Sequence, residues 1–454
     1  MNTEKNAAGG RDHPRSLMAM KNDRRLRNAA ALLLAGAMLI SLFACGSREG
    51  DSDASTGGQT TGAPPSLSSS SLPDTDSPAP GTGASPGTEA PSADLPVDLT
   101  AAPFRIITNP KESGTQLSEV LSAFVTKLKS IDGLSFTVAS DTMNDGSDGL
   151  AEIVIGNADR PGCAEICAEF GPLDWSVTCS SGRIYLCGGT PDMTAKAVYW
   201  LLANYVAKNI LTVPAGVLYR SVSSVKLPDI PDPQPYEGRA LKGLTVFAIG
   251  DSYFAGQGLD PKKEVWPALL ALKQGESFEN YGIGGSTLSD YITTNTPVCR
   301  RIATMKAGDP DIVILEGGAN DWNHCVPLGE PGSTDTKTFR GAAASCIEQL
   351  HAKYPGAFIV CVTNWDYGRK NSQNVESTAY AEAFCEVAAR YPFAMPVNAS
   401  DTSVIPAFVT NSAFRAKYCI SSTDQSHLNA EGMRLLLPFF EKIIGEGYEK
   451  FKRF

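Results

Sequence analysis

Leu244-Thr-Val-Phe-Ala-Ile-Gly-Asp-Ser-Tyr253 places a short apolar run directly before Gly250, Asp251 and Ser252. An apolar run of β-branched and aromatic residues bounded by glycine predicts a buried strand. The residues that follow, through Trp266–Leu272, predict a helix. A serine at the exit of a buried strand lies at the open edge of a sheet, where open α/β folds place their chemistry. Taken alone, the triplet is better explained as a strand-to-helix turn with an N-cap.

Strands and helices alternate along residues 238–454. Apolar runs predict strands at 244–249, 276–280, 311–316, 358–363 and 394–397, and helical spacing predicts helices near 263–273, 297–306, 336–353, 376–390 and 430–445. This alternation predicts an α/β fold with a parallel sheet between two helical layers. The runs at 312–315 and 358–362 are apolar throughout, as expected of strands buried on both faces.

Three further polar motifs follow or flank these elements. Asn280-Tyr-Gly-Ile-Gly-Gly-Ser-Thr287 comes after the second strand, and Gly317-Gly-Ala-Asn-Asp321 comes after the third. Asp424-Gln-Ser-His-Leu-Asn429 precedes the last helix. Each motif alone is more simply a turn or a helix cap. Together with Ser252 they supply every part that serine acyl transfer requires.

The four motifs resemble the conserved blocks of the SGNH (GDSL-type) hydrolase superfamily. The matching positions are Gly250–Ser252, then Asn280, Gly282 and Gly285, then Gly318–Asp321, then Asp424 and His427. The resemblance implies a flavodoxin-like, three-layer αβα parallel sheet and hydrolysis of carboxylic esters, with no cofactor and no metal. Tyr253 stands where many members have a small or aliphatic residue, and we expect it to narrow the acyl pocket.

The resemblance and the residue chemistry together assign the roles. Ser252 is the expected nucleophile, and His427 is the base that activates it. Asp424 is expected to orient the His427 ring, since His427 alone among the four histidines has an acidic residue at a suitable offset. The expected oxyanion hole consists of the backbone N–H groups of Ser252 and Gly285 and the side-chain amide of Asn320.

Four more residues are candidates to line the cleft because they lie next to these motifs. They are Asp251, Tyr253, Asp321 and His324. Structural roles are equally compatible with the sequence for Asp321. Both alternatives therefore stay open from the sequence.

The N-terminal segment predicts export. Arg24, Arg25 and Arg27 precede a short apolar run at 29–43, which is typical of a signal peptide. The run ends in Leu42-Phe-Ala-Cys-Gly46, which resembles the lipobox of bacterial lipoproteins. Residues 1–45 are therefore expected to be a lipoprotein signal, with Cys45 lipidated and the protein anchored to the outer face of the bacterial cell membrane. An ordinary signal peptide or a stop-transfer helix is the alternative.

Two segments separate this signal from the α/β domain. Residues 46–98 are rich in Ser, Thr, Gly, Pro and Asp, a composition that predicts a disordered tether. Residues 99–226 predict a small α+β domain, with strands at 104–108 and 152–156, a hairpin at 175–187, and helices at 117–128 and 194–207. A Pro-rich stretch at 227–237 predicts a stiff linker.

The small domain resembles the accessory N-terminal domain of β-hexosaminidase-type and α-glucuronidase-type glycoside hydrolases. The similar segments are Glu152-Ile-Val-Ile-Gly-Asn-Ala-Asp-Arg-Pro161, Gly182-Arg-Ile-Tyr-Leu-Cys-Gly-Gly189 and Ala197-Val-Tyr-Trp-Leu-Leu202. The resemblance implies a context of glycan degradation, although no glycosidase barrel follows. A purely structural spacer is the alternative.

Composition narrows the partners. A net charge of −10, with no basic stripe in the folded part, argues against nucleic-acid binding. The ten cysteines after Cys45 include no CxxC pair, so we expect neither a zinc site nor a disulfide framework. The sequence thus predicts a surface-anchored esterase acting on short acyl groups of a glycan or another small ester. A lipase or thioesterase, and a non-catalytic glycan-binding lipoprotein, are the alternatives.

Overall fold

The computed structural model describes residues 95–143, 148–292 and 296–453. The expected signal segment, Cys45 and the tether up to residue 94 lie outside the described residues. Among the residues described, no helix is long and apolar enough to cross a membrane. Two larger sheets organise this part of the chain, and each is built from its own stretch of sequence.

The sheet that carries the motifs has five parallel strands in the order β10-β9-β11-β12-β13. These strands are β9 (Thr245–Gly250), β10 (Ser277–Gly282), β11 (Ile312–Gly317), β12 (Phe358–Thr363) and β13 (Ala394–Val397). Counted along the chain, the order is 2-1-3-4-5, the order of flavodoxin-like sheets. The predicted fold class is therefore confirmed.

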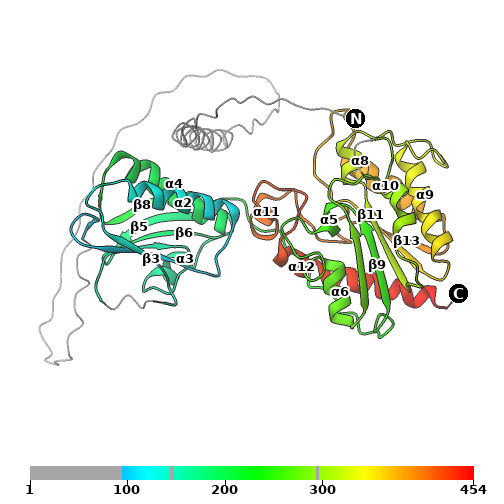
Figure 1. Ribbon diagram of the computed structural model, residues 1–454, viewed down its shortest axis with the longest axis horizontal. Helices are drawn as coiled ribbons and strands as arrows, with labels where there is room; N and C mark the ends of the chain where they lie inside the picture. Colours follow the sequence, from blue (N-terminus) through cyan, green and yellow to red (C-terminus); the bar gives the residue numbers. More distant parts are fainter. Residues whose placement is uncertain (1–94, 144–147, 293–295, 454) are drawn as a thin grey trace, which may run out of the picture. The chain divides into compact units, whose positions relative to one another are not determined.

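Helices cover both faces of this sheet (Figure 1). The helices α6 (Trp266–Gln274) and α12 (Ala430–Phe451) pack together on one face, where the rings of Trp266 and Phe440 stack at 3.9 Å. The helices α9 (Phe339–Lys353) and α10 (Ser377–Ala388) pack together on the other face. This gives the three layers that the alternating pattern predicts.

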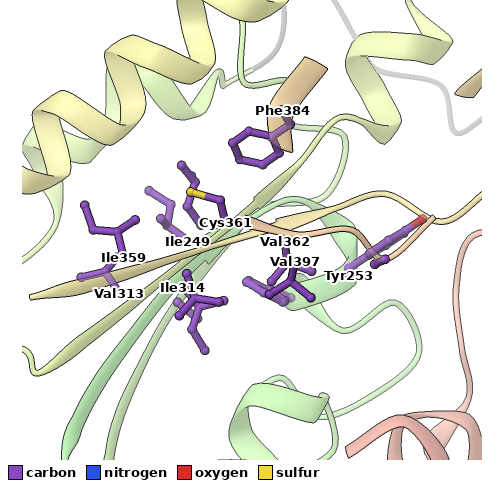
Figure 2. Packing of buried hydrophobic residues seen from close by; sticks show 14 of the residues in the cluster. Ile249, Tyr253, Val313, Ile314, Ile359, Cys361, Val362, Phe384 and Val397 are labelled. Carbon is purple, nitrogen blue, oxygen red and sulfur yellow. The ribbon is translucent and has the colours of Figure 1, made fainter. Parts of the chain in front are cut away.

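The core lies between these layers. Every residue of β11 and β12 is buried, as predicted from their continuous apolar runs. Figure 2 shows Ile359 and Cys361 on the side of Phe384, while Val362 and Val397 point to the opposite side. Both faces of the central strands are thus packed, as expected of a parallel sheet covered by helices on each side.

The second large sheet has six strands in the order β3-β2-β4-β6-β5-β8. They are β2 (Phe104–Thr108), β3 (Phe136–Ser140), β4 (Glu152–Ile155), β5 (Trp175–Ser180), β6 (Arg183–Gly188) and β8 (Gly216–Ser221). The first four in this order pair in parallel, and β5 is antiparallel to both of its neighbours. Two further short strands, β1 (Val97–Asp98) and β7 (Thr212–Val213), form a separate antiparallel pair.

Helices α2 (Thr115–Lys129) and α4 (Pro191–Asn204) pack on one face of this six-stranded sheet, and the short α3 (Cys163–Cys167) packs on the other (Figure 1). The predicted hairpin closes through Ser181 and Gly182, which both have positive φ, the geometry of a two-residue hairpin turn. The predicted helix at 194–207 begins three residues earlier, because Pro191 supplies a favourable first helical residue.

Several shorter elements complete the chain. They are the helices α5 (Ser252–Ala255), α7 (Val298–Arg301), α8 (Ala319–Asn323) and α11 (Ser412–Tyr418), with the 3₁₀ turns Val206–Lys208 and Ile302–Thr304. Of these, α5 and α8 carry residues of the candidate site. The sequence did not indicate either one as a separate element.

Candidate active site

Ser252 lies at the first residue of α5, directly after β9. The side chain of Asp251 caps this turn by accepting the Tyr253 N–H at 3.0 Å. Gly256, with φ +72°, ends the turn after four residues. The helix predicted near 263–273 corresponds to α6, and the short α5 before it was not predicted. Ser252 sits on a tightly capped single turn.

A hydrogen-bonded chain joins Ser252, His427 and Asp424. The distance between Ser252 Oγ and His427 Nε2 is 2.9 Å, and the distance between His427 Nδ1 and Asp424 Oδ2 is also 2.9 Å. The two segments that meet here are 175 residues apart in sequence. The structure thus brings together the three residues that the sequence proposed as nucleophile, base and orienting acid.

The Asp424 carboxylate is held as an anion by its neighbours. Partial burial alone would raise the pKa of Asp424, but the hydrogen bond to the His427 ring and the N–H groups of His427 and Ser426 lower it below its usual value. Those two N–H groups donate to Oδ1 at 2.9 and 2.7 Å. Oδ2 is therefore left to face the imidazole. An ionised acceptor at Nδ1 favours the tautomer in which Nε2 accepts a proton from the serine.

Aromatic side chains hold His427 from the protein side. The Tyr253 ring meets the imidazole edge-on at 6.3 Å between centroids and stacks on Trp365 at 5.0 Å. Trp365 Nε1 donates to the Ser426 carbonyl at 3.0 Å. Tyr253 OH also contacts Tyr367 OH. We expected Tyr253 to narrow the acyl pocket, but it is only 3% exposed and packs against the His427 ring.

The end of β10 is hydrogen-bonded to the turn that follows Ser252. The Asn280 amide donates to the carbonyls of Phe254 and Pro261, both at 2.8 Å, and its oxygen accepts the Gly282 N–H at 2.8 Å. A Cβ on Gly282 would lie 2.4 Å from the backbone nitrogen of Ala255, which explains why glycine is needed there. This packing fixes the loop that carries the exposed Gly284 and Gly285, and a Cβ on Gly284 would lie 3.9 Å from Ser252 Cβ.

The expected oxyanion donors gather in this region, with one difference. Ser252 starts α5, so its N–H has no acceptor within the turn. Gly285 is exposed and has φ +77°, a conformation that favours glycine. Asn320 Nδ2, however, already donates to Asp251 Oδ2 at 2.8 Å and to the Ser286 carbonyl at 2.9 Å. Its two amide hydrogens are thus engaged, and reaching an oxyanion requires one of them to be shared.

Two buried carboxyl groups accept hydrogen bonds from the backbone next to the site. The Asp321 side chain is fully buried and accepts the N–H groups of Leu288 and Ser289 at 2.8 and 3.0 Å. Burial raises the pKa of Asp321 to about 7, although those N–H groups oppose the shift. Asp251 is also fully buried. Both residues were candidates to line the cleft, but each is buried and its carboxylate accepts backbone N–H groups instead.

Glu316 was not predicted to belong to the site. It is fully buried on β11, and its Oε2 accepts the Asp251 N–H at 2.9 Å. Burial, reinforced by Asp251, raises the pKa of Glu316 well above its usual range. A glutamate inside the apolar run at 311–316 was the available sequence signal. Arg301, which donates to the carbonyls of Gly250 and Tyr281, carried no comparable signal.

His324 ends α8 and is exposed. Its backbone N–H donates to the Asn320 carbonyl at 2.9 Å. Among the described residues, the one group of side chains spaced to hold a metal ion consists of Cys163, Cys167 and Cys187. That group includes none of the candidate site residues.

Comparison with known proteins identifies the family of this part of the chain. Residues 248–435 match the model of the GDSL-like Lipase/Acylhydrolase family, and this range includes every motif residue from Gly250 to His427. No curated protein matches the chain.

Among solved structures, 106 chains are similar. A protein from Lactobacillus plantarum is 23% identical over 45% of this chain and 98% of its own, with a TM-score of 0.38. A carbohydrate acetylesterase family member from Sinorhizobium meliloti is 16% identical over 45% of this chain and 99% of its own, with a TM-score of 0.32. A carbohydrate esterase family 2 enzyme with a carbohydrate binding domain, from Corynascus thermopiles, is 15% identical over 54% of this chain and 73% of its own, with a TM-score of 0.32.

Proposed function

We propose that this chain, an SGNH-type ester hydrolase, removes short acyl groups, acetyl above all, from carbohydrate. The proposal starts from the match of residues 248–435 to the GDSL-like Lipase/Acylhydrolase family. Ser252, His427 and Asp424 are the proposed catalytic triad. The observation that carries the triad is the continuous hydrogen-bonded chain from Ser252 Oγ through the His427 ring to Asp424, with 2.9 Å at each link.

In the proposed reaction, His427 Nε2 takes the proton of Ser252 Oγ as that oxygen attacks the ester carbonyl. The C–O bond to the sugar then breaks, and the imidazolium gives its proton to the leaving alkoxide. Water repeats the sequence on the acyl-enzyme, which releases the carboxylic acid and restores the serine. Asp424 stays ionised throughout and stabilises the imidazolium.

Negative charge on the carbonyl oxygen would be stabilised by the N–H groups of Ser252 and Gly285 and by the Asn320 amide. Removal of one such donor typically costs about 3–4 kcal/mol of transition-state stabilisation. Because Asn320 also donates to Asp251 and Ser286, its orientation is fixed before substrate binds. Both of its amide hydrogens are engaged in these bonds, so one of them would have to be shared with the oxyanion as it forms.

The preference for a short acyl group rests on the loops around Ser252. In the described parts of the loops at 282–292, 318–328 and 419–429, the exposed large apolar side chains are Ile283, Tyr291 and Ile420. A site for a long acyl chain is expected to have a more extensive apolar lining. This observation supports an acetyl-sized substrate over a lipid.

The carbohydrate part of the proposal rests on the N-terminal half of the chain. The segment from Arg24 to Cys45 has the pattern of a lipoprotein export signal, which would place the enzyme on the outer face of the cell membrane, beside acylated polysaccharide and peptidoglycan. Metabolic labelling with an alkyne fatty acid tests this location. Label should be incorporated by the wild-type chain and lost in Cys45→Ala; equal labelling of both would refute the anchor.

Substrate class is tested with the full chain on p-nitrophenyl esters of increasing length and on acetylated xylan, pectin and peptidoglycan. We expect the highest kcat/KM on the acetyl ester and release of acetate from one of the polymers. Ser252→Ala should abolish both activities, and Ser345→Ala, a serine of α9 outside the site, should keep them. Rates that rise with acyl length would favour a lipase or thioesterase, and absence of hydrolysis would favour a binding protein.

A further inference from the structure

Three cysteine side chains lie close together between α3 and the face of the six-stranded sheet that it covers. Cys163 and Cys167 are the first and last residues of α3, one helical turn apart, so they face the same side. Cys187 comes from β6, the strand beneath that helix. The three Sγ atoms all lie within 4.8 Å of one another. The sequence predicted no metal site because no CxxC pair is present, but it could not show that a strand brings a third cysteine to the CxxxC helix.

The spacing of these sulfur atoms matches shared coordination of a metal. The distance between Cys163 Sγ and Cys187 Sγ is 3.8 Å. With metal–sulfur bonds of about 2.3 Å, two sulfurs on one ion are separated by about 3.8 Å in a tetrahedral site and about 4.0 Å in a trigonal one. A disulfide needs about 2.05 Å, and all three cysteines are free thiols here.

The surroundings hold the three sulfurs in this arrangement. Tyr185 OH donates to the Pro161 carbonyl at 2.5 Å, which fixes the start of α3 above β6. The Cys163 and Cys187 thiols both point at one acceptor, the Gly156 carbonyl, at 3.2 and 3.6 Å. A cysteine that merely fills space in a core needs no second sulfur beside it. Here one short helix and one strand together place three sulfur atoms close to one another.

We propose that Cys163, Cys167 and Cys187 bind a single thiophilic d¹⁰ metal ion, Zn²⁺ or Cu⁺. Thiolate ligands select these ions over the hard cations Mg²⁺ and Ca²⁺. Each thiol releases its proton when the metal binds. Cys163 and Cys187 are buried, and the half-buried Cys167 gives the ion access from solvent.

The expected role of the ion is structural. The α3 helix has five residues, far fewer than an isolated helix needs in water. A metal bound by both of its ends and by β6 would tie this helix to the sheet, and such binding free energy adds directly to folding stability. The site is independent of Ser252, so the proposal does not depend on the esterase assignment.

The test uses the reduced full chain, prepared free of metal and titrated separately with Co²⁺, Zn²⁺, Cu⁺ and Mg²⁺. We expect a thiolate-to-cobalt charge-transfer band, displaced by one equivalent of Zn²⁺ or Cu⁺, and a rise in Tm with either ion but not with Mg²⁺. Cys167→Ala should weaken binding by at least about tenfold while esterase activity on p-nitrophenyl acetate stays unchanged. A far-UV circular dichroism spectrum equal to that of the metal-free wild type shows that the variant is folded.

Cys179→Ala is the matched control, because Cys179 is a buried cysteine of the same sheet whose Sγ lies outside this group. It should bind metal as the wild type does. The proposal is overturned if no thiolate–cobalt band appears in the reduced wild type, or if Cys167→Ala binds as tightly as Cys179→Ala. A disulfide between two of the three cysteines in the freshly isolated native protein would overturn it as well.

Discussion

Replacement of Asp424 by asparagine tests whether this residue sets the tautomer of His427. Oδ1 of Asp424 accepts two backbone N–H groups, at 2.7 and 2.9 Å. Each hydrogen bond to this carboxylate is worth about 1.5–3 kcal/mol, so in Asp424→Asn the remaining oxygen should stay at this position. The new NH₂ group then takes the place of Oδ2, which lies 2.9 Å from His427 Nδ1 in the wild type.

An NH₂ donor at Nδ1 forces that nitrogen to be the acceptor and moves the ring proton to Nε2. His427 then presents an N–H to Ser252 and cannot accept its proton. Loss of the correct tautomer in a serine triad lowers kcat by about 10⁴-fold, equivalent to about 5.4 kcal/mol at about 1.36 kcal/mol per tenfold. We expect a loss of that size in kcat with KM little changed, measured on p-nitrophenyl acetate.

Asp401→Asn is the matched control, because Asp401 also accepts a backbone N–H and a hydroxyl within its own turn, from Ser403 at 2.9 and 2.7 Å, and its pKa is also lowered by these bonds. That variant removes the same charge but should keep full activity. Less than about a tenfold loss in folded Asp424→Asn would refute the tautomer argument.

Three further predictions concern the buried support of the site. Burial raises the pKa of Asp321 to about 7. Between about pH 4 and that value, the folded protein holds a proton on Asp321 that the unfolded chain has released. The unfolding free energy should therefore fall as pH rises from about 4 to about 7, with a slope of up to ~1.4 kcal/mol per pH unit. Urea unfolding across that range should show a shallower slope in Asp321→Asn than in the wild type, because Glu316 and Glu276, whose pKa values burial also raises, remain in both proteins; equal slopes would contradict the role of Asp321. Glu316→Gln should keep activity close to wild type because its amide oxygen can still accept the Asp251 N–H, whereas Glu316→Ala should lose about 1–3 kcal/mol of stability by leaving that buried N–H without an acceptor; equal damage in the two variants, by Tm and kcat/KM, would contradict this role of Glu316. Gly282→Ala should lower both Tm and kcat/KM, because its Cβ would lie 2.4 Å from the Ala255 nitrogen, while the Cβ of Gly284→Ala has no neighbour closer than 3.9 Å and should leave Tm unchanged; equal Tm values for the two glycine variants would contradict the packing argument.

The sheet that carries the site could be predicted because its strands have a simple pattern. The apolar runs at 312–315 and 358–362 are buried on both faces, as their sequences indicate. Parallel strands end at one edge of a sheet, so the motifs after β9, β10 and β11 had to lie close together. The sequence alone therefore predicts that Ser252, Gly285 and Asn320 lie close together.

Elements held by tertiary contacts were harder to predict. The edge strand Phe136–Ser140 pairs with one neighbour, has only five residues, and none of them is fully buried. Helix α12 was expected to end near residue 445 but runs to Phe451. Its Gly445 and Gly447 look like helix ends in sequence, yet a Cβ on either would collide with Tyr236 or Met395. Close packing, not termination, requires these glycines.

The buried polar groups of the site were predicted least well. Asp251 and Asp321 lie in the motifs and so suggested contact with substrate, but the structure uses their carboxylates as acceptors for backbone N–H groups. Glu316 and Arg301 lie outside the motifs and act on the same backbone from neighbouring elements. Sequence spacing records which residues lie near each other in the chain, whereas these roles depend on which elements pack together.

The central claim, that Ser252 is the nucleophile activated by His427, is tested most directly by covalent labelling. The full chain is treated with a serine-reactive fluorophosphonate, and intact mass and peptide mapping identify the modified residue. We predict one adduct per chain, on Ser252, with complete loss of p-nitrophenyl acetate hydrolysis and no adduct in Ser252→Ala. An adduct on another residue, or undiminished hydrolysis by Ser252→Ala, would contradict the claim.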